Sequence, residues 1–121
     1  MGKRILVVED QEDNRRILRD LLKAAGYDTI EAVNGEEGVA VAQAQKPDLI
    51  LMDIQLPVMD GYEATRRIRA NEELKSIPII AVTSYALSGD DEKAFEVGCD
   101  AYVTQPFSPR ALLGKIKTYL G

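Results

Sequence analysis

The apolar positions of this chain follow two alternating patterns. Short continuous apolar runs are typical of strands buried on both faces of a parallel sheet, and they alternate with stretches in which apolar residues recur every three or four positions, as on one face of a helix. The predicted strands cover residues 5–8, 27–33, 49–52, 79–82 and 101–104. In the second strand Asp28, Thr29 and Glu31 alternate with apolar neighbours, which indicates one wetter side and a position at the sheet edge.

Five helices are predicted between and after these strands. From their apolar spacing and end signals they cover about residues 12–25, 36–45, 62–74, 88–97 and 108–120. Ser108 followed by Pro109 is typical of a helix start, with a capping hydroxyl and a proline in the first turn. The apolar faces of the first, fourth and fifth helices include Ile17, Phe95 and Tyr119, respectively.

Five strands alternating with five helices, joined by connections of a few residues, predict right-handed crossovers and helices on both faces of one parallel sheet. The predicted fold class is therefore α/β, a single doubly wound (βα)5 domain. A chain of 121 residues with 45% hydrophobic residues is long enough to bury about two thirds of its unfolded surface in a core. No internal repeat, linker or low-complexity segment interrupts the pattern, so residues 1–121 are expected to form one domain.

Composition excludes several classes of protein. Cys99 is the only cysteine and histidine is absent, which excludes Cys/His zinc sites and histidine-dependent acid–base catalysis. The net charge of -5 argues against nonspecific binding to nucleic acid or to acidic membrane surfaces. The N-terminal residues lead directly into a strand, without a signal-like or membrane-spanning apolar segment. We therefore expect a cytoplasmic protein with neither nucleic acid nor membrane as a partner.

Polar side chains stand where the predicted strands end. Glu9 and Asp10 follow the first run, Asp53 closes the central run, Thr83 closes the fourth and Gln105 follows the fifth. Ligands of open parallel sheets bind beyond the carboxyl ends of the strands. The fold is therefore expected to bring these five side chains to one edge of the sheet.

The carboxylates in this group suggest a specific chemistry. Carboxylates held close together repel one another and raise one another's pKa unless a cation neutralises them. Oxygen ligands select a hard ion, and Mg²⁺ typically uses one or two carboxylates together with waters and a phosphate oxygen. With a phosphoryl donor on the metal, Asp53 would act as the nucleophile and form an aspartyl-phosphate. Glu9 and Asp10 would hold the ion, and the Thr83 hydroxyl would donate a hydrogen bond to a phosphoryl oxygen.

Each of these residues also has a purely structural interpretation. An acidic pair after a strand commonly caps the next helix, and Asp53 could be a turn residue. Thr83 could be a strand former or a cap, and Tyr102 could be an ordinary core or rim aromatic. Their joint position at strand ends favours the chemical interpretation.

Four segments together carry a specific pattern. They are the acidic pair ending at Asp10, LILMDIQLPVMDG around Asp53, VTSYA from Val82 and DAYVTQPF from Asp100. With these segments the whole chain resembles the receiver domain of bacterial two-component response regulators. The resemblance implies a flavodoxin-like sheet with strand order 2-1-3-4-5 and no output domain, as in single-domain regulators of the DivK-like and CheY-like kinds or in receivers of hybrid histidine kinases.

The resemblance also implies a function for the acidic edge. Asp53 would accept a phosphoryl group from a phosphohistidine on a sensor histidine kinase or a histidine phosphotransfer protein. Mg²⁺ would be held by Asp10, Asp53 and the Gln55 carbonyl, with Glu9 acting through water. Such a chain is a signalling protein rather than a turnover enzyme, with at most slow self-dephosphorylation.

By the same resemblance, Thr83 would be the switch hydroxyl and Tyr102 the switch aromatic. Phosphorylation would then remodel the face made by the fourth helix, the fifth strand and the fifth helix, which is a population shift in a bistable element. A downstream target protein would bind this face, with residues 85–87 and Tyr102 as candidate contacts. We expect a monomer or a weak dimer.

One position departs from the family pattern, because Gln105 stands where the family has a lysine before the proline. An amide can donate a hydrogen bond to a phosphoryl group but supplies no charge. Three explanations remain open: a receiver adapted to work without the lysine, a pseudo-receiver retained for docking that is independent of phosphorylation, and an engineered variant made to uncouple the switch.

Two other classes of function fit the sequence less well. A phosphatase with an aspartyl nucleophile would need a second acid two residues after Asp53, where the sequence has Gln55. A flavin-binding module of the same fold would need a phosphate loop rich in glycine and hydroxyl groups after the first strand. Residues 9–13 include four carboxylates instead, which would repel a phosphate.

Overall fold

Five parallel strands form one sheet in the computed structural model of this chain, which describes residues 2–83, 90–105 and 107–121. The strands are β1 (Arg4–Val8), β2 (Asp28–Ala32), β3 (Leu49–Asp53), β4 (Ile79–Thr83) and β5 (Ala101–Thr104). Their order in the sheet is β2-β1-β3-β4-β5. This order confirms the doubly wound α/β fold, and it places β2 at an edge, as its polar pattern predicts.

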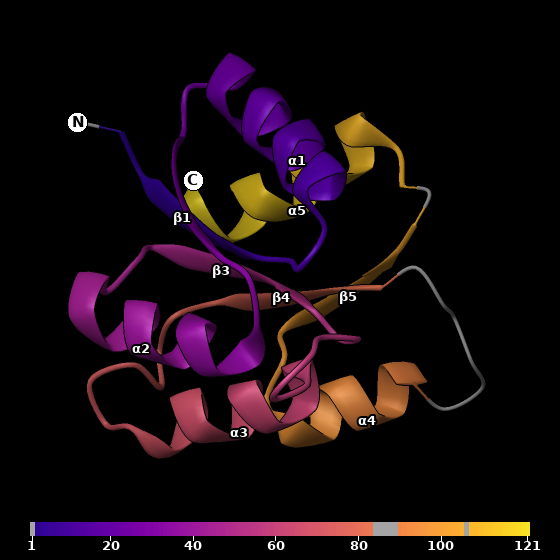
Figure 1. Cartoon of the computed structure of the whole chain (residues 1–121). Coiled ribbons are helices and arrows are strands. Elements are labelled where there is room, and N and C mark those ends of the chain that lie inside the picture. The colour runs from indigo at the N-terminus through magenta and orange to yellow at the C-terminus, as the bar shows by residue number, and fades with distance from the viewer. Residues whose placement is uncertain (1, 84–89, 106) are drawn as a thin grey trace.

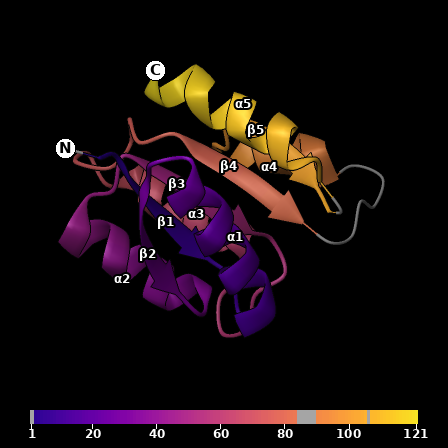
Figure 2. The same cartoon turned by 90° about the horizontal axis from the view of Figure 1, so that it is seen from above.

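Helices cover both faces of the sheet. They are α1 (Glu12–Ala24), α2 (Gly35–Gln45), α3 (Gly61–Ala70), α4 (Asp90–Val97) and α5 (Pro109–Leu120). Helices α1 and α5 lie together on one face, and α2, α3 and α4 lie on the other (Figures 1 and 2). The sheet is therefore the middle layer of three.

Alternate strand residues enter two separate hydrophobic cores. Leu6, Ile50 and Ile79 face the core under α2, α3 and α4, whereas the core under α1 and α5 receives their chain neighbours Leu49 and Ile80. All five side chains are fully buried. Each such burial contributes roughly 1.5–3 kcal/mol, which holds the strand ends in fixed positions.

Helix α3 ends earlier than the sequence predicts. Its last residue is Ala70, although the apolar pattern extends to Leu74. Asn71 adopts an extended conformation, and its side-chain oxygen accepts a hydrogen bond of 2.9 Å from the backbone N–H of Glu73. This local side-chain bond competes with the helical one, so Leu74 reaches the core from a turn. The predicted start of the fourth helix at Ser88 lies outside the described residues.

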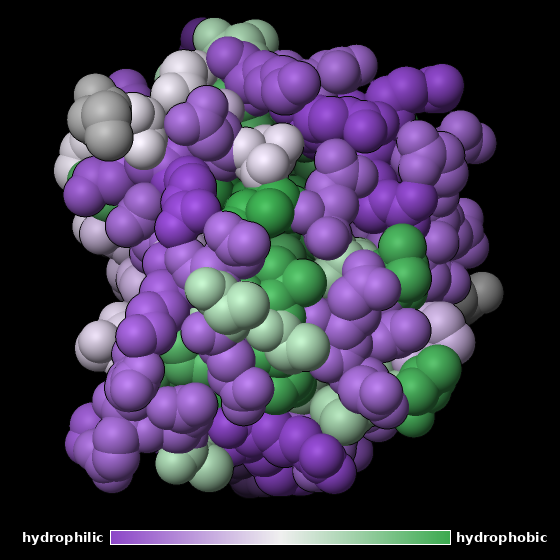
Figure 3. All heavy atoms as spheres, turned by 60° about the vertical axis from the view of Figure 1, so that its left-hand side comes forward, coloured by the Kyte–Doolittle hydropathy of each residue, from purple (hydrophilic) through white to green (hydrophobic). Residues whose placement is uncertain are grey.

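Three apolar side chains predicted on the inner faces of helices are exposed instead. Ile17, Phe95 and Tyr119 have exposed fractions of 56%, 50% and 38%. In α1 the buried stripe consists of Leu18 and Leu22 alone, so a neighbour one position away already faces water. Figure 3 shows one face of the molecule that is largely hydrophilic, with hydrophobic residues emerging near its middle. None of the helices in the described residues is long and apolar enough to span a bilayer.

Candidate functional site

Three carboxylates meet at the carboxyl edge of the sheet. Glu9 and Asp10 follow β1 and Asp53 ends β3, and these two strands are hydrogen-bonded neighbours. One carboxylate oxygen of each residue lies within 4.8 Å of the other two. Glu9 and Asp53 are buried, with exposed fractions of 3% and 8%, whereas Asp10 is exposed. The structure thus brings together the three acidic residues that the sequence analysis places at strand ends.

Burial and like charge raise the pKa of two of these groups. The pKa of Glu9 rises to about 7, chiefly through burial and further through the charges of Asp53 and Asp10. The pKa of Asp53 rises to about 6, again chiefly through burial and then through the charge of Asp10. Backbone N–H groups oppose both shifts: Gln11 donates to Glu9 Oε2 at 3.0 Å, and Gln55 donates to Asp53 Oδ1 at 3.2 Å. The cluster is therefore short of positive charge.

The donor set fits a hard divalent cation. All three side chains offer carboxylate oxygens, which suit Mg²⁺ or Ca²⁺ better than softer metals. An open cleft of about 400 Å³ adjoins the cluster and is lined by Asp10, Gln55 and Asp60, among others. This volume exceeds that of several waters, each occupying about 30 Å³ in the liquid, so a hydrated ion with a further ligand fits there.

The loop after β3 is held tightly against the strand end. The Gly61 N–H donates to the Ile54 carbonyl at 2.9 Å, and a Cβ atom at Gly61 would lie 2.2 Å from the Asp53 carbonyl oxygen. Only glycine allows this approach. Val58 has a φ of 69°, in the left-handed region that β-branched residues rarely adopt. The α3 helix then begins at an N-cap whose side chain, Asp60, accepts a hydrogen bond from Glu63.

The loop after β1 is held by Arg15, which the sequence analysis did not identify. Its guanidinium donates to the backbone carbonyls of Glu9 and Asp10 at 2.9 and 3.1 Å. The same group pairs with Glu31 of β2 at 3.2 Å and with Glu12. Arg15 thus ties the loop that carries two of the carboxylates to the edge strand. No sequence signal separates it from other helical arginines, because the Glu9 and Asp10 carbonyls and the Glu31 carboxylate lie outside its helix.

Thr83 and Tyr102 lie on the strands beyond β3. Thr83 ends β4 and is buried, directly after Val82, which pairs with Asp53 in the sheet. Tyr102 on β5 pairs with Ala81 and packs, half-buried, against the core under α2, α3 and α4. Their roles as switch residues stay predictions. The candidate contact residues 85–87 lie outside the described residues.

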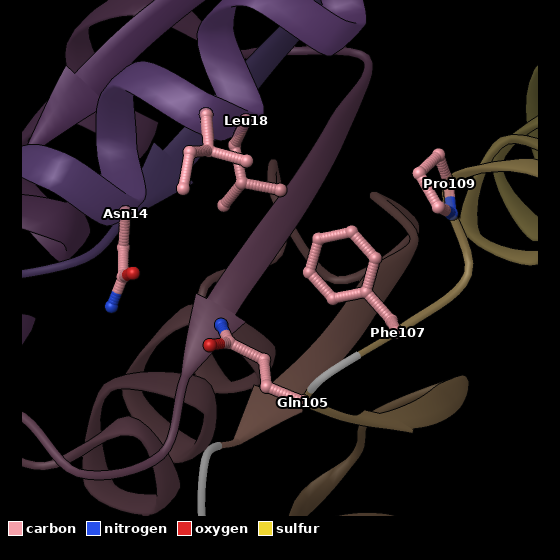
Figure 4. A pocket seen from close by; sticks show the side chains of 6 residues that line it. Asn14, Leu18, Gln105, Phe107 and Pro109 are labelled. Atoms are coloured by element: carbon pink, nitrogen blue, oxygen red, sulfur yellow. The ribbon is translucent and has the colours of Figure 1, made fainter.

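Gln105 lies beside a different pocket. Its backbone N–H donates to the Thr83 carbonyl at 2.7 Å, which continues the pairing of β4 with β5. Its side chain lines a pocket of about 220 Å³ between α1 and the segment before α5, and Figure 4 shows its amide end on the side where Asn14 lies. The opposite wall carries Phe107 and Pro109. Gln105, which stands where the family has a lysine, therefore faces α1 rather than the cleft lined by Asp10.

The sequence matches a known family and close relatives over its length. The response regulator receiver domain matches residues 5–117. The polar-differentiation response regulator DivK of Brucella anthropi is 46% identical over 121 residues, which cover 100% of this chain and 98% of that protein. DivK of Brucella ovis is similar to the same extent.

Solved receiver structures superpose closely on this fold. The receiver domain of sensor histidine kinase PA1611 from Pseudomonas aeruginosa PAO1, with a magnesium ion coordinated in its active site cleft, has a TM-score of 0.93 and 40% identity, covering 100% of this chain and 99% of that one. The chemotaxis protein CheY4 of Vibrio cholerae has a TM-score of 0.91 and 28% identity, covering 98% and 99%. The match over residues 5–117, together with relatives aligned over the full length, shows that this chain belongs to the response regulator receiver domain family of two-component systems.

Proposed function

We propose that this chain accepts a phosphoryl group on Asp53 from a phosphohistidine of a sensor histidine kinase or histidine phosphotransfer protein, with Mg²⁺ as cofactor. The observation that carries the proposal is the cluster of Glu9, Asp10 and Asp53, whose carboxylates lie within 4.8 Å of one another at the end of β1 and β3. The magnesium ion in the similar PA1611 receiver supports the choice of cation.

In the proposed reaction a carboxylate oxygen of Asp53 attacks the phosphorus atom. A P–O bond forms as the P–N bond to the donor imidazole breaks, and the imidazole leaves with the electron pair of that bond. Asp10, Asp53 and the Gln55 carbonyl would hold Mg²⁺, with Glu9 acting through water, and the ion would offset negative charge as the phosphoryl group approaches. The Gln55 N–H orients the Asp53 carboxylate by donating to Oδ1.

The output of the proposed reaction is a change in protein contacts. Thr83 would hydrogen-bond the phosphoryl group, Tyr102 would turn inward, and a target protein would bind the face made by α4, β5 and α5. The chain would act in the cytoplasm as a monomer or weak dimer, with at most slow self-dephosphorylation.

Intact-protein mass spectrometry after incubation with acetyl phosphate tests the proposal. One phosphoryl adduct is expected with Mg²⁺ and none with a chelator. The adduct should be absent in Asp53→Asn and present in Asp20→Asn, which removes an exposed carboxylate on α1. An adduct that persists in Asp53→Asn would show that another residue is the acceptor.

The position of Gln105 favours one alternative, a pseudo-receiver that docks without phosphorylation. Its side chain lines the pocket with Asn14 and Phe107, and an amide there contributes no charge to a phosphoryl group. The same mass measurement on Gln105→Lys separates the two functions. An adduct in the parent chain supports the phosphoacceptor, whereas an adduct only in Gln105→Lys supports the docking module.

A further inference from the structure

A groove lies between the end of α1 and helix α5. It has a volume of about 550 Å³ and is lined by Ala25, Tyr27, Arg110, Leu113, Gly114 and Lys117. Helix α1 has 13 residues at about 1.5 Å each, so Ala25 lies roughly 20 Å along the helix from the loop of Glu9 and Asp10. The groove shares no lining residue with the acidic cluster or with the pocket of Gln105. It is therefore a separate surface feature.

The groove carries positive charge on an acidic protein. Helix α5 contains Arg110, Lys115 and Lys117 and no acidic residue, in a chain whose net charge is -5. Several other cations of the described residues are paired, as Arg19 is with Glu31. Within residues 2–83, 90–105 and 107–121 neither Arg110 nor Lys117 forms an ion pair, and both are exposed. Two unpaired cations thus flank the half-buried apolar side chains of the groove.

The floor of the groove is open because Gly114 has no side chain. A Cβ atom at Gly114 would meet no heavy atom within 4 Å, and its φ is not positive, so neither space nor backbone geometry requires glycine. Glycine inside a helix costs roughly 0.5–1 kcal/mol relative to alanine. This glycine leaves the groove wider than any larger residue would, at some expense of helix stability.

We propose that this groove binds an acidic segment of a partner protein. An apolar side chain of the segment packs on Tyr27 and Leu113, and its carboxylates face Arg110 and Lys117. Charge at the groove selects this occupant, because Arg110 and Lys117 attract the carboxylates of an acidic segment and repel a basic one. Binding here goes beyond phosphorylation at Asp53 and does not require it.

Selection from a random peptide library displayed on phage, with the full chain as bait, tests the proposal. Counter-selection uses Gly114→Leu, which fills the groove with a good helix former and therefore keeps the fold. The matched control is Ala111→Leu, which adds the same side chain to an exposed position of α5 outside the groove. Thermal unfolding followed by circular dichroism verifies that both variants are folded.

The expected peptides carry Asp or Glu beside a Leu or Phe residue. Their affinity should fall about tenfold or more in Gly114→Leu and about two- to fivefold in Arg110→Gln or Lys117→Gln, as for exposed ion pairs. Ala111→Leu and Asp53→Asn should bind these peptides with the affinity of the parent chain. The test of peptide binding therefore does not depend on whether Asp53 is phosphorylated. Recovery of no peptide, of peptides without acidic residues, or of peptides that bind Gly114→Leu equally well overturns the proposal. Self-association abolished by Gly114→Leu would instead identify a second copy as the occupant.

Discussion

Replacement of Asp53 by asparagine should stabilise the metal-free protein at neutral pH. The Asp53 side chain is 8% exposed, and its pKa rises from 3.8 to about 6 because of burial and the nearby Asp10 charge. A rise of about two pKa units corresponds to about 3 kcal/mol by which the folded state disfavours the charged form. Asparagine keeps the shape of the side chain and carries no charge. We expect the free energy of unfolding to increase on the order of 2 kcal/mol at pH 8, because Asp53 and Glu9 titrate together and share the effect.

The sign of the pH dependence follows from the same shift. Between pH 4 and 6 the folded state binds more protons than the unfolded state, so the free energy of unfolding falls as the pH rises through this window and remains low above it. The stabilisation by Asp53→Asn should therefore be larger at pH 8 than at pH 5. Urea unfolding followed by circular dichroism, in the presence of a chelator, measures both values.

Two further measurements isolate the cause. Asp20→Asn, which removes an exposed carboxylate of α1, should change the free energy of unfolding by less than about 0.5 kcal/mol at either pH. Addition of Mg²⁺ should increase the free energy of unfolding of the parent chain more than that of the Asp53→Asn variant, because an ion that binds the folded state adds to its stability. A variant that is no more stable than the parent at pH 8, or whose gain is larger at pH 5, would refute the conclusion that the buried charge of Asp53 destabilises the fold.

Four other substitutions test loops and helices of the fold. Gly61→Ala should lower the free energy of unfolding by at least about 2 kcal/mol, because its Cβ would lie 2.2 Å from the Asp53 carbonyl oxygen. Gly114→Ala should raise the free energy of unfolding by about 0.5–1 kcal/mol, because a Cβ atom there meets open space. Urea unfolding compares the two variants. Arg69→Met should lower the free energy of unfolding by about 3 kcal/mol and speed amide hydrogen exchange near Ile77. The reason is that Arg69 donates to the carbonyls of Gly98 and Ile77 at 2.8 and 2.7 Å and pairs with Asp100. Arg15→Met should weaken Mg²⁺ binding severalfold in isothermal titration calorimetry, because the loop of Glu9 and Asp10 loses its support; unchanged affinity with lower stability would show a purely structural role.

The layers of the fold could be predicted from the sequence because continuous apolar runs and helical spacing leave few arrangements open. The edge position of β2 could also be predicted, because Asp28 and Glu31 give this strand a polar side, whereas the strand order was implied by the family resemblance. Errors arose at the end of α3, where Asn71 ends the helix before Leu74, and at single positions. Ile17 and Phe95 share the apolar spacing of their helices but lie beside the buried stripe, and spacing locates a helical face only to within about one residue.

The candidate site was partly predictable for a related reason. Glu9, Asp10 and Asp53 stand at strand ends, and parallel strands carry their ends to one edge, so their proximity follows from topology. Arg15 and Gly61 were missed because their contacts depend on segments brought together by the fold. Arg15 of α1 contacts Glu31 of β2, and Gly61 approaches the backbone of Asp53 across a loop of seven residues. Neither contact can be predicted from the residues next to it in the sequence.

The acidic cluster is difficult to explain by the stability of the fold. Glu9 and Asp53 are buried, each with a raised pKa, and no ion pair among the described residues involves them or Asp10. Buried carboxylates without a compensating charge reduce the free energy of unfolding, whereas well-packed apolar residues at the same strand ends would increase it. A cation bound from solution would remove this deficit and gain affinity from it. The acidic sheet edge therefore costs stability and attracts positive charge, which supports the proposed role of Asp53 as a phosphoacceptor.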